Sequence, residues 1–105
     1  MKMEFIIDDE KCKKEGFEKA DCFAASFAAI RKHFDKWNKN GTIKEIQEGI
    51  FVGEEDDINA FGSTFSLTDT NWFLKVIKEW YWYNEDEKED CLKSYYRTVM
   101  KSNKL

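Results

Sequence analysis

Residues 72–84 read WFLKVIKEWYWYN, and the conformation of this stretch decides the fold. Residues 68–71 (TDTN) precede it and are all of types that cap helices. Within the stretch, the apolar positions recur at spacings of three, one and three, which predicts one face of a helix. These positions are Phe73, Val76, Ile77 and Trp80. We therefore expect a helix over 72–84.

Four consecutive rings, residues 80–83, end this predicted helix. Neighbouring residues on a helix point about 100° apart, so the four rings do not share one face. With Trp80 toward the core, Trp82 projects about 160° away. Trp and Tyr are enriched at binding hot spots, so the outer side of this helix is predicted to bind a protein partner or a second copy. The alternatives are a helix buried on two sides, or a stretch that is not helical. The predicted partner-binding residues are Leu74, Lys75, Lys78, Tyr81 and Trp82.

Hydrophobic periodicity predicts the other elements. Apolar positions at spacings of four and three indicate a long helix over 18–37, and a second stripe indicates a helix from Leu92 onward. Residues 2–8 and 42–52 are predicted as strands. A hairpin is one arrangement of 42–52, and a short helix is the alternative there. A short helix is favoured over 58–67 against a strand.

These elements predict an α+β fold that is mainly helical, with three to four helices packed on a small two- or three-stranded sheet. A chain of 105 residues suits one domain, 1–105, whose last residues 102–105 are expected to fray. Hydrophobic residues make up 42% of the chain and aromatic residues 16%, which indicates a globular protein.

The predicted location is the cytoplasm, without membrane contact. No apolar run approaches the roughly 20 residues that cross a bilayer, and the first residues, MKMEFIIDDEK, lack a signal-peptide core. The three cysteines, at positions 12, 22 and 91, are widely and irregularly spaced. That pattern is unlike a secreted disulfide framework, so reduced thiols are expected, with Cys22 and Cys91 packed as small apolar groups.

A basic row on the last predicted helix is the second candidate site. Its residues recur at spacings of four, four and three, and they are Lys93, Arg97, Lys101 and Lys104. They are candidates for phosphate contact in a nucleic-acid-binding regulator. The formal net charge of −4 argues against this function, and a solvated charged face is the ordinary explanation. Tyr95 and Tyr96 are expected to belong to the core.

Three acidic clusters, at 8–10, 54–57 and 85–90, form a third candidate. They would mimic a polyanion if they shared one face, whereas solvated loops and acidic helix starts are the simpler explanation. The sequence has neither the ligand spacing of a calcium-binding loop nor the paired spacing of zinc ligands. A catalytic pair of His33 with Cys22 or Cys91 is not supported by any spacing either. We therefore expect no metal site, no cofactor and no enzymatic activity.

Taken together, these features predict a small protein that acts by protein–protein binding, as an inhibitor, immunity factor or accessory subunit. Homodimerisation through the same surface is a close variant, because a two-fold interface uses one set of residues twice. Nucleic-acid binding through the basic face of the C-terminal helix is the alternative.

Overall fold

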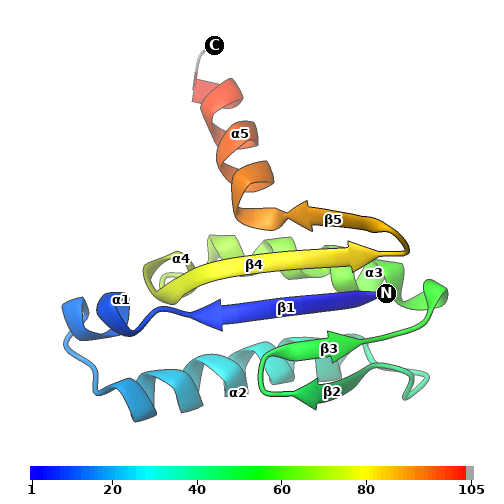
Figure 1. Ribbon diagram of the computed structural model, residues 1–105, viewed down its shortest axis with the longest axis horizontal. Coiled ribbons are helices and arrows are strands. Elements are labelled where there is room, and N and C mark those ends of the chain that lie inside the picture. The colour runs from blue at the N-terminus through cyan, green and yellow to red at the C-terminus, as the bar shows by residue number, and fades with distance from the viewer. Residues whose placement is uncertain (104–105) are drawn as a thin grey trace.

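A computed structural model describes residues 1–103 of the chain. Its centre is a five-stranded antiparallel sheet with the order β2-β3-β1-β4-β5 (Figure 1). The strands are β1 (Lys2–Ile7), β2 (Lys44–Gln47), β3 (Ile50–Val52), β4 (Ile77–Asn84) and β5 (Glu87–Asp90). The prediction of a two- or three-stranded sheet is therefore wrong, although helices hold 54% of the residues and strands 25%.

Helices lie between the strands in sequence, and one follows the last strand. The α-helices are α1 (Asp9–Lys14), α2 (Lys19–Trp37), α3 (Ile58–Gly62), α4 (Phe73–Val76) and α5 (Cys91–Asn103). Two 3-10 helices, η1 (Glu55–Asp57) and η2 (Ser63–Asp69), flank α3. Among the described residues, no helix combines the length and the apolar character needed to cross a membrane.

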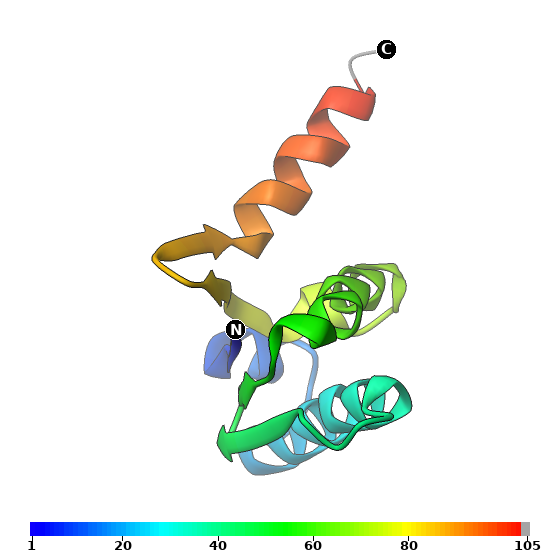
Figure 2. The ribbon, with the colours of Figure 1, turned by 90° about the vertical axis from the view of Figure 1, so that its right-hand side faces the viewer.

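The sheet is covered on one face only. In Figure 2, α2 and the helical segment from α3 to α4 lie on the same side of the strands, whereas no helix of residues 1–103 covers the other side. Strand β1 alternates accordingly: Met3, Phe5 and Ile7 are buried, and the residues between them are half-buried. The core lies between this face and the helices. Phe5 is at its centre, with ring centroids 5.9–6.2 Å from Phe34, Phe51, Phe73 and Trp80.

The predicted helix over 72–84 is wrong beyond its first turn. Helix α4 ends at Val76, and Ile77 has extended backbone angles (φ −75°, ψ 132°). Strand β4 then pairs with β1 on one side and β5 on the other. Because side chains alternate across a sheet, Trp80 and Trp82 point toward the helices, while Tyr81 and Tyr83 point to the open face.

Several predicted elements are confirmed, including the C-terminal helix, which is α5. Strand β1 lies within 2–8, and helix α2 covers 19–37 of the predicted 18–37. Residues 42–52 form a hairpin in which β2 pairs with β3. Its turn contains Gly49 at φ 84°, in the left-handed region that favours glycine.

Two of the three cysteines are not reduced. Cys12 in α1 and Cys22 in α2 form a disulfide with 6.0 Å between their Cα atoms. The expectation of three reduced thiols is therefore wrong, because α1 folds back on the start of α2 and brings together two cysteines ten residues apart. Cys91 is free and fully buried at the start of α5, as expected of a small apolar group.

Candidate functional site

Helix α5 projects from the body of the protein (Figures 1 and 2). Asp90, at the end of β5, caps its first turn by accepting a hydrogen bond from the Lys93 backbone amide at 3.1 Å. Cys91 and Leu92 anchor the helix against the core. The rest of α5 extends away from the sheet (Figure 2), and residues 96–98 on it are exposed.

An apolar stripe runs along this projecting helix. Its members recur at spacings of three, one and three, and they are Leu92, Tyr95, Tyr96 and Val99. The Tyr95 and Tyr96 rings meet edge-on with 5.3 Å between centroids. Tyr96 is 47% exposed, so the expectation that it belongs to the core is wrong. The stripe is typical of a helix that packs against another element. In this chain Leu92 packs on the core, Tyr95 and Val99 are half-buried, and Tyr96 is exposed.

The predicted basic row is only partly within the described region. Lys93 and Arg97 lie on α5 and are exposed. Lys101 belongs to α5, but its side chain falls outside the description, and Lys104 lies outside the described residues altogether. Two cations of the row, four residues apart, are thus placed on one helix.

The predicted partner-binding residues are not brought to one surface. Leu74 packs against the core from α4, and the Lys75 ammonium lies 3.9 Å from a Glu15 carboxylate oxygen. Trp82 points to the helix side of the sheet, where it stacks on Phe61. Tyr81 points to the opposite side, and Lys78 is exposed. The helical geometry from which this surface was predicted does not exist.

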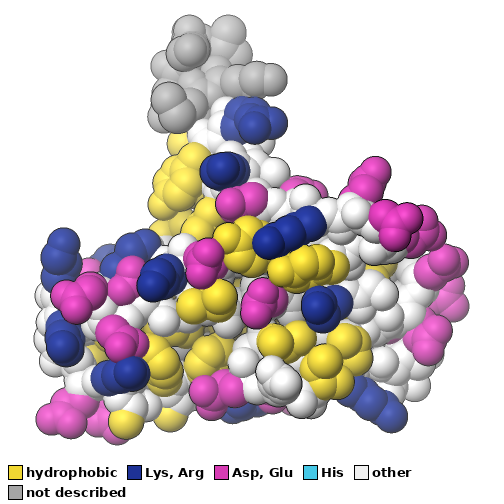
Figure 3. Space-filling model, viewed as in Figure 1, with side chains coloured by type: hydrophobic (Ala, Val, Ile, Leu, Met, Phe, Trp, Pro, Cys, Tyr) yellow, Lys and Arg dark blue, Asp and Glu magenta, His cyan; other side chains and the backbone are white. Residues whose placement is uncertain are grey.

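The open face of the sheet carries aromatic rings that charged groups cover. The Lys88 ammonium lies 4.1 Å from the Tyr81 ring centroid, and that of Lys2 lies 4.4 Å from the Tyr83 ring. The Tyr81 hydroxyl donates a hydrogen bond to the Glu79 carboxylate at 2.7 Å. This hydrogen bond, together with partial desolvation and nearby carboxylates, raises the pKa of Tyr81 to about 12. In Figure 3, apolar side chains on this face alternate with basic and acidic ones. The face is therefore suited to solvent contact.

The acidic clusters do not share one face. Residues 8–10 lie where β1 leads into α1, at one end of the strands, whereas 54–57 and 85–86 lie at the other end (Figure 1). Asp57 is buried, and its carboxylate accepts hydrogen bonds from the Thr42 hydroxyl and the Glu54 amide. A polyanion mimic made of all three clusters is incompatible with this arrangement.

No constellation for metal binding or nucleophilic catalysis is seen among residues 1–103. No three potential metal ligands of the His, Cys, Asp and Glu types cluster there. His33 lies 2.9 Å from the Ser63 hydroxyl, and burial, with the nearby Lys36, lowers its pKa. Burial beside two acidic residues raises the pKa of Cys91 to about 12, so its reactive thiolate is disfavoured. Cys22 is in the disulfide.

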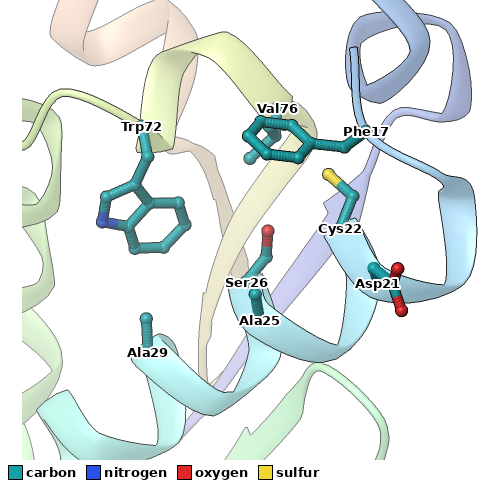
Figure 4. A pocket seen from close by; sticks show the side chains of 8 residues that line it. All are labelled: Phe17, Asp21, Cys22, Ala25, Ser26, Ala29, Trp72 and Val76. Atoms are coloured by element: carbon teal, nitrogen blue, oxygen red, sulfur yellow. The ribbon is translucent and has the colours of Figure 1, made fainter. Parts of the chain in front are cut away.

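An apolar groove lies between α2 and α4 and was not anticipated from the sequence (Figure 4). Its volume is about 440 Å³. The rings of Phe17 and Trp72 form its sides, and α2 forms its floor with Cys22, Ala25, Ser26 and Ala29. Phe17 and Cys22–Ala29 are close in sequence, but Trp72–Val76 lies more than about 40 residues further along, so only the folded chain brings the two parts together.

Comparison with known proteins gives no further guide to function. No family model, no curated protein and no solved structure matches this chain.

Proposed function

We propose that this protein is a non-catalytic binding protein whose helix α5 inserts its apolar stripe into a groove on another protein. The observation that carries the proposal is that Tyr96, a member of the apolar stripe, is 47% exposed on a helix that projects from the body. Tyrosine supplies a large, rigid contact area and is enriched at binding hot spots. Roles as an inhibitor, immunity factor or accessory subunit all fit this mode of action.

Helix energetics support a partner for α5. Isolated helices shorter than about 12–15 residues are marginal in water, and α5 has 13 residues. Packing of the stripe against another surface would stabilise the outer turns of α5. This arrangement is the helix-in-groove mode, in which positions i, i+3, i+4 and i+7 act as anchors. Leu92, Tyr95, Tyr96 and Val99 have that spacing.

The charges on α5 define the chemistry of the partner. Lys93 and Arg97 are exposed four residues apart, about 100° and 140° around the helix from Leu92. A groove with an apolar floor and an acidic rim would complement both features. The same two cations are the basis of the alternative, nucleic-acid binding, but the stripe gives the protein partner more contact area.

Site-specific photo-crosslinking in the source cell tests this proposal. A photoreactive phenylalanine analogue replaces Tyr96 in one variant and Thr98 in a control variant. Thr98 lies about 200° from Tyr96 around the same helix. We expect one protein to crosslink from position 96 and not from 98. The purified partner should then lose at least about tenfold in affinity on Tyr96→Asp, while Thr98→Asp leaves its affinity within about twofold.

The other outcomes are equally informative. Equal crosslinking from both positions, or equal affinity of both aspartate variants, would contradict the proposal. Crosslinking to nucleic acid, with binding that weakens steeply with salt and on Lys93→Ala with Arg97→Ala, would favour the alternative. A doubled mass in light scattering that Tyr96→Asp abolishes would identify the partner as a second copy.

The predicted cytoplasmic location also stays a proposal. The disulfide removes the argument from reduced thiols, because disulfides persist mainly in oxidising compartments. Trapping thiols in intact cells with a membrane-permeant alkylating agent tests it directly. Alkylation of Cys12 and Cys22 in the cell would fit a reducing compartment, and their protection would overturn the cytoplasmic location.

A further inference from the structure

We infer that the groove between α2 and α4 binds a small, uncharged aromatic molecule that carries one hydrogen-bonding group. The inference does not rest on the role of α5, because no residue of α5 lines the groove. Its volume of about 440 Å³ lies within the range of about 300–1,000 Å³ that is typical of small-molecule sites.

The walls favour a flat apolar ligand. Phe17 and Trp72 approach the groove from different segments, and both rings border the same space above α2 (Figure 4). Aromatic rings favour stacked or edge-to-face contact with another ring. Phe17 is 57% exposed, although it is a large apolar residue, and a ring bound beside it would remove part of that surface from water.

The floor has room for such a ring because its residues are small. Ala25 and Ala29 point from α2 toward the space between the helices, and the Cys22 sulfur borders one end (Figure 4). Sulfur next to an aromatic ring makes a favourable contact. Larger residues at these alanine positions would fill the site.

Ser26 supplies the hydrogen bond. The residue is only 5% exposed, and its hydroxyl points into the groove (Figure 4). The hydroxyl lines the groove, and it is not one of the buried side-chain atoms that lack a hydrogen-bond partner, so it is accessible from the groove. A ligand that hydrogen-bonds to it would take the place of water there and would gain orientation.

The charges around the groove argue for an uncharged ligand. Asp21 is the one ionisable residue among those that line it, and its carboxylate points away from the space between the rings (Figure 4). Transfer of an ion into this apolar space would be penalised because no opposite charge faces it. A phenol or an indole has the required shape, polarity and single donor.

Titration of the full-length protein with p-cresol and toluene tests the inference, because the two probes differ by one hydroxyl. Heteronuclear NMR follows the indole N–H of Trp72 and the amides of Ala25 and Ala29. We expect both probes to shift these signals, with a Kd for p-cresol below about 1 mM. Ser26→Ala should lower the affinity for p-cresol about five- to tenfold and should leave the affinity for toluene within about twofold of its original value.

Filling the groove provides the second test. Ala29→Leu should abolish binding of both probes, whereas Ala28→Leu, on the exposed side of α2 and outside the groove, should leave it unchanged. If Ala29→Leu fails to fold, Ala25→Leu at the exposed rim replaces it. The inference is overturned if neither probe binds, if the shifts map elsewhere, if Ser26→Ala affects both probes equally, or if the filled variants still bind.

Discussion

The indole of Trp82 stacks on the ring of Phe61, with 6.4 Å between their centroids and 19° between their planes. Phe61 is fully buried in α3, and Trp82 packs against the core from β4. The stack therefore joins the central sheet to the helical layer, and Trp82 contributes to folding rather than to a docking surface on a helix.

Trp82→Ala should lower the free energy of unfolding by about 2–4 kcal/mol, because it removes a large side chain that packs on the core. Tyr81→Ala, one residue away on the open face, should cost less, since it loses mainly cross-strand contacts worth about 0.2–1 kcal/mol each. Urea denaturation followed by circular dichroism measures both. An equal decrease in the free energy of unfolding for the two variants would contradict the placement of Trp82.

The oxidised native protein should resist thiol alkylation completely. Cys12 and Cys22 are joined, and the buried Cys91 has its pKa raised to about 12. After unfolding without reductant, mass spectrometry should detect one alkylated cysteine. Cys12→Ser with Cys22→Ser should lower stability by about 2–4 kcal/mol, the usual effect of opening such a loop. Three labelled cysteines in the non-reduced unfolded chain would show that the disulfide does not form.

Gly49→Ala should destabilise the protein more than Gly41→Ala does. Both glycines have positive φ, so both variants carry backbone strain of about 1 kcal/mol or more. A Cβ at Gly49 would also lie 2.5 Å from the Phe5 carbonyl oxygen and 2.7 Å from the Phe27 ring, whereas Gly41 has open space. Thermal denaturation of the two variants compares them. Equal melting temperatures would contradict the close approach at Gly49.

Stability should fall as the pH drops below about 6.5 because of His33. Burial lowers the pKa of His33 from its ordinary value of 6.5. Above that value both the folded and unfolded states hold a neutral ring. Below it the unfolded chain takes up the proton first, so the free energy of unfolding decreases until the pH passes the folded pKa. His33→Gln should flatten this part of the urea-denaturation profile between pH 7 and 5, and an unchanged slope would contradict the assignment.

Elements specified by local patterns were predicted well. The stripe over 18–37, the hairpin over 42–52 and the strand at the N-terminus each carry a clear period or turn residue within a short window. Residues 77–84 carry two periods at once. Their helical spacing fits Trp80 with Phe73 and Val76, while the alternation of Trp and Tyr fits a strand, and pairing with β1 some 75 residues away decides between them.

The candidate sites depended even more on distant contacts. A disulfide needs two cysteines whose Cα atoms are a suitable distance apart in space. The spacing of cysteines along the chain does not reveal that distance. The groove combines residues from before α2, within α2 and around α4, and Ser26 looked like an ordinary small residue of a helix. The projecting α5 was predicted as a helix, but its apolar stripe gave no sign that the sheet would leave it uncovered.

The alternation of indole and phenol along β4 makes slippage of that strand very costly. A shift of one residue against β1 would send the two hydroxyls of Tyr81 and Tyr83 among the phenylalanines and expose both tryptophans to water. Other registers of the central strands are therefore much less stable than the native one. For this reason a sheet whose strands are short and differ in length still folds into one arrangement.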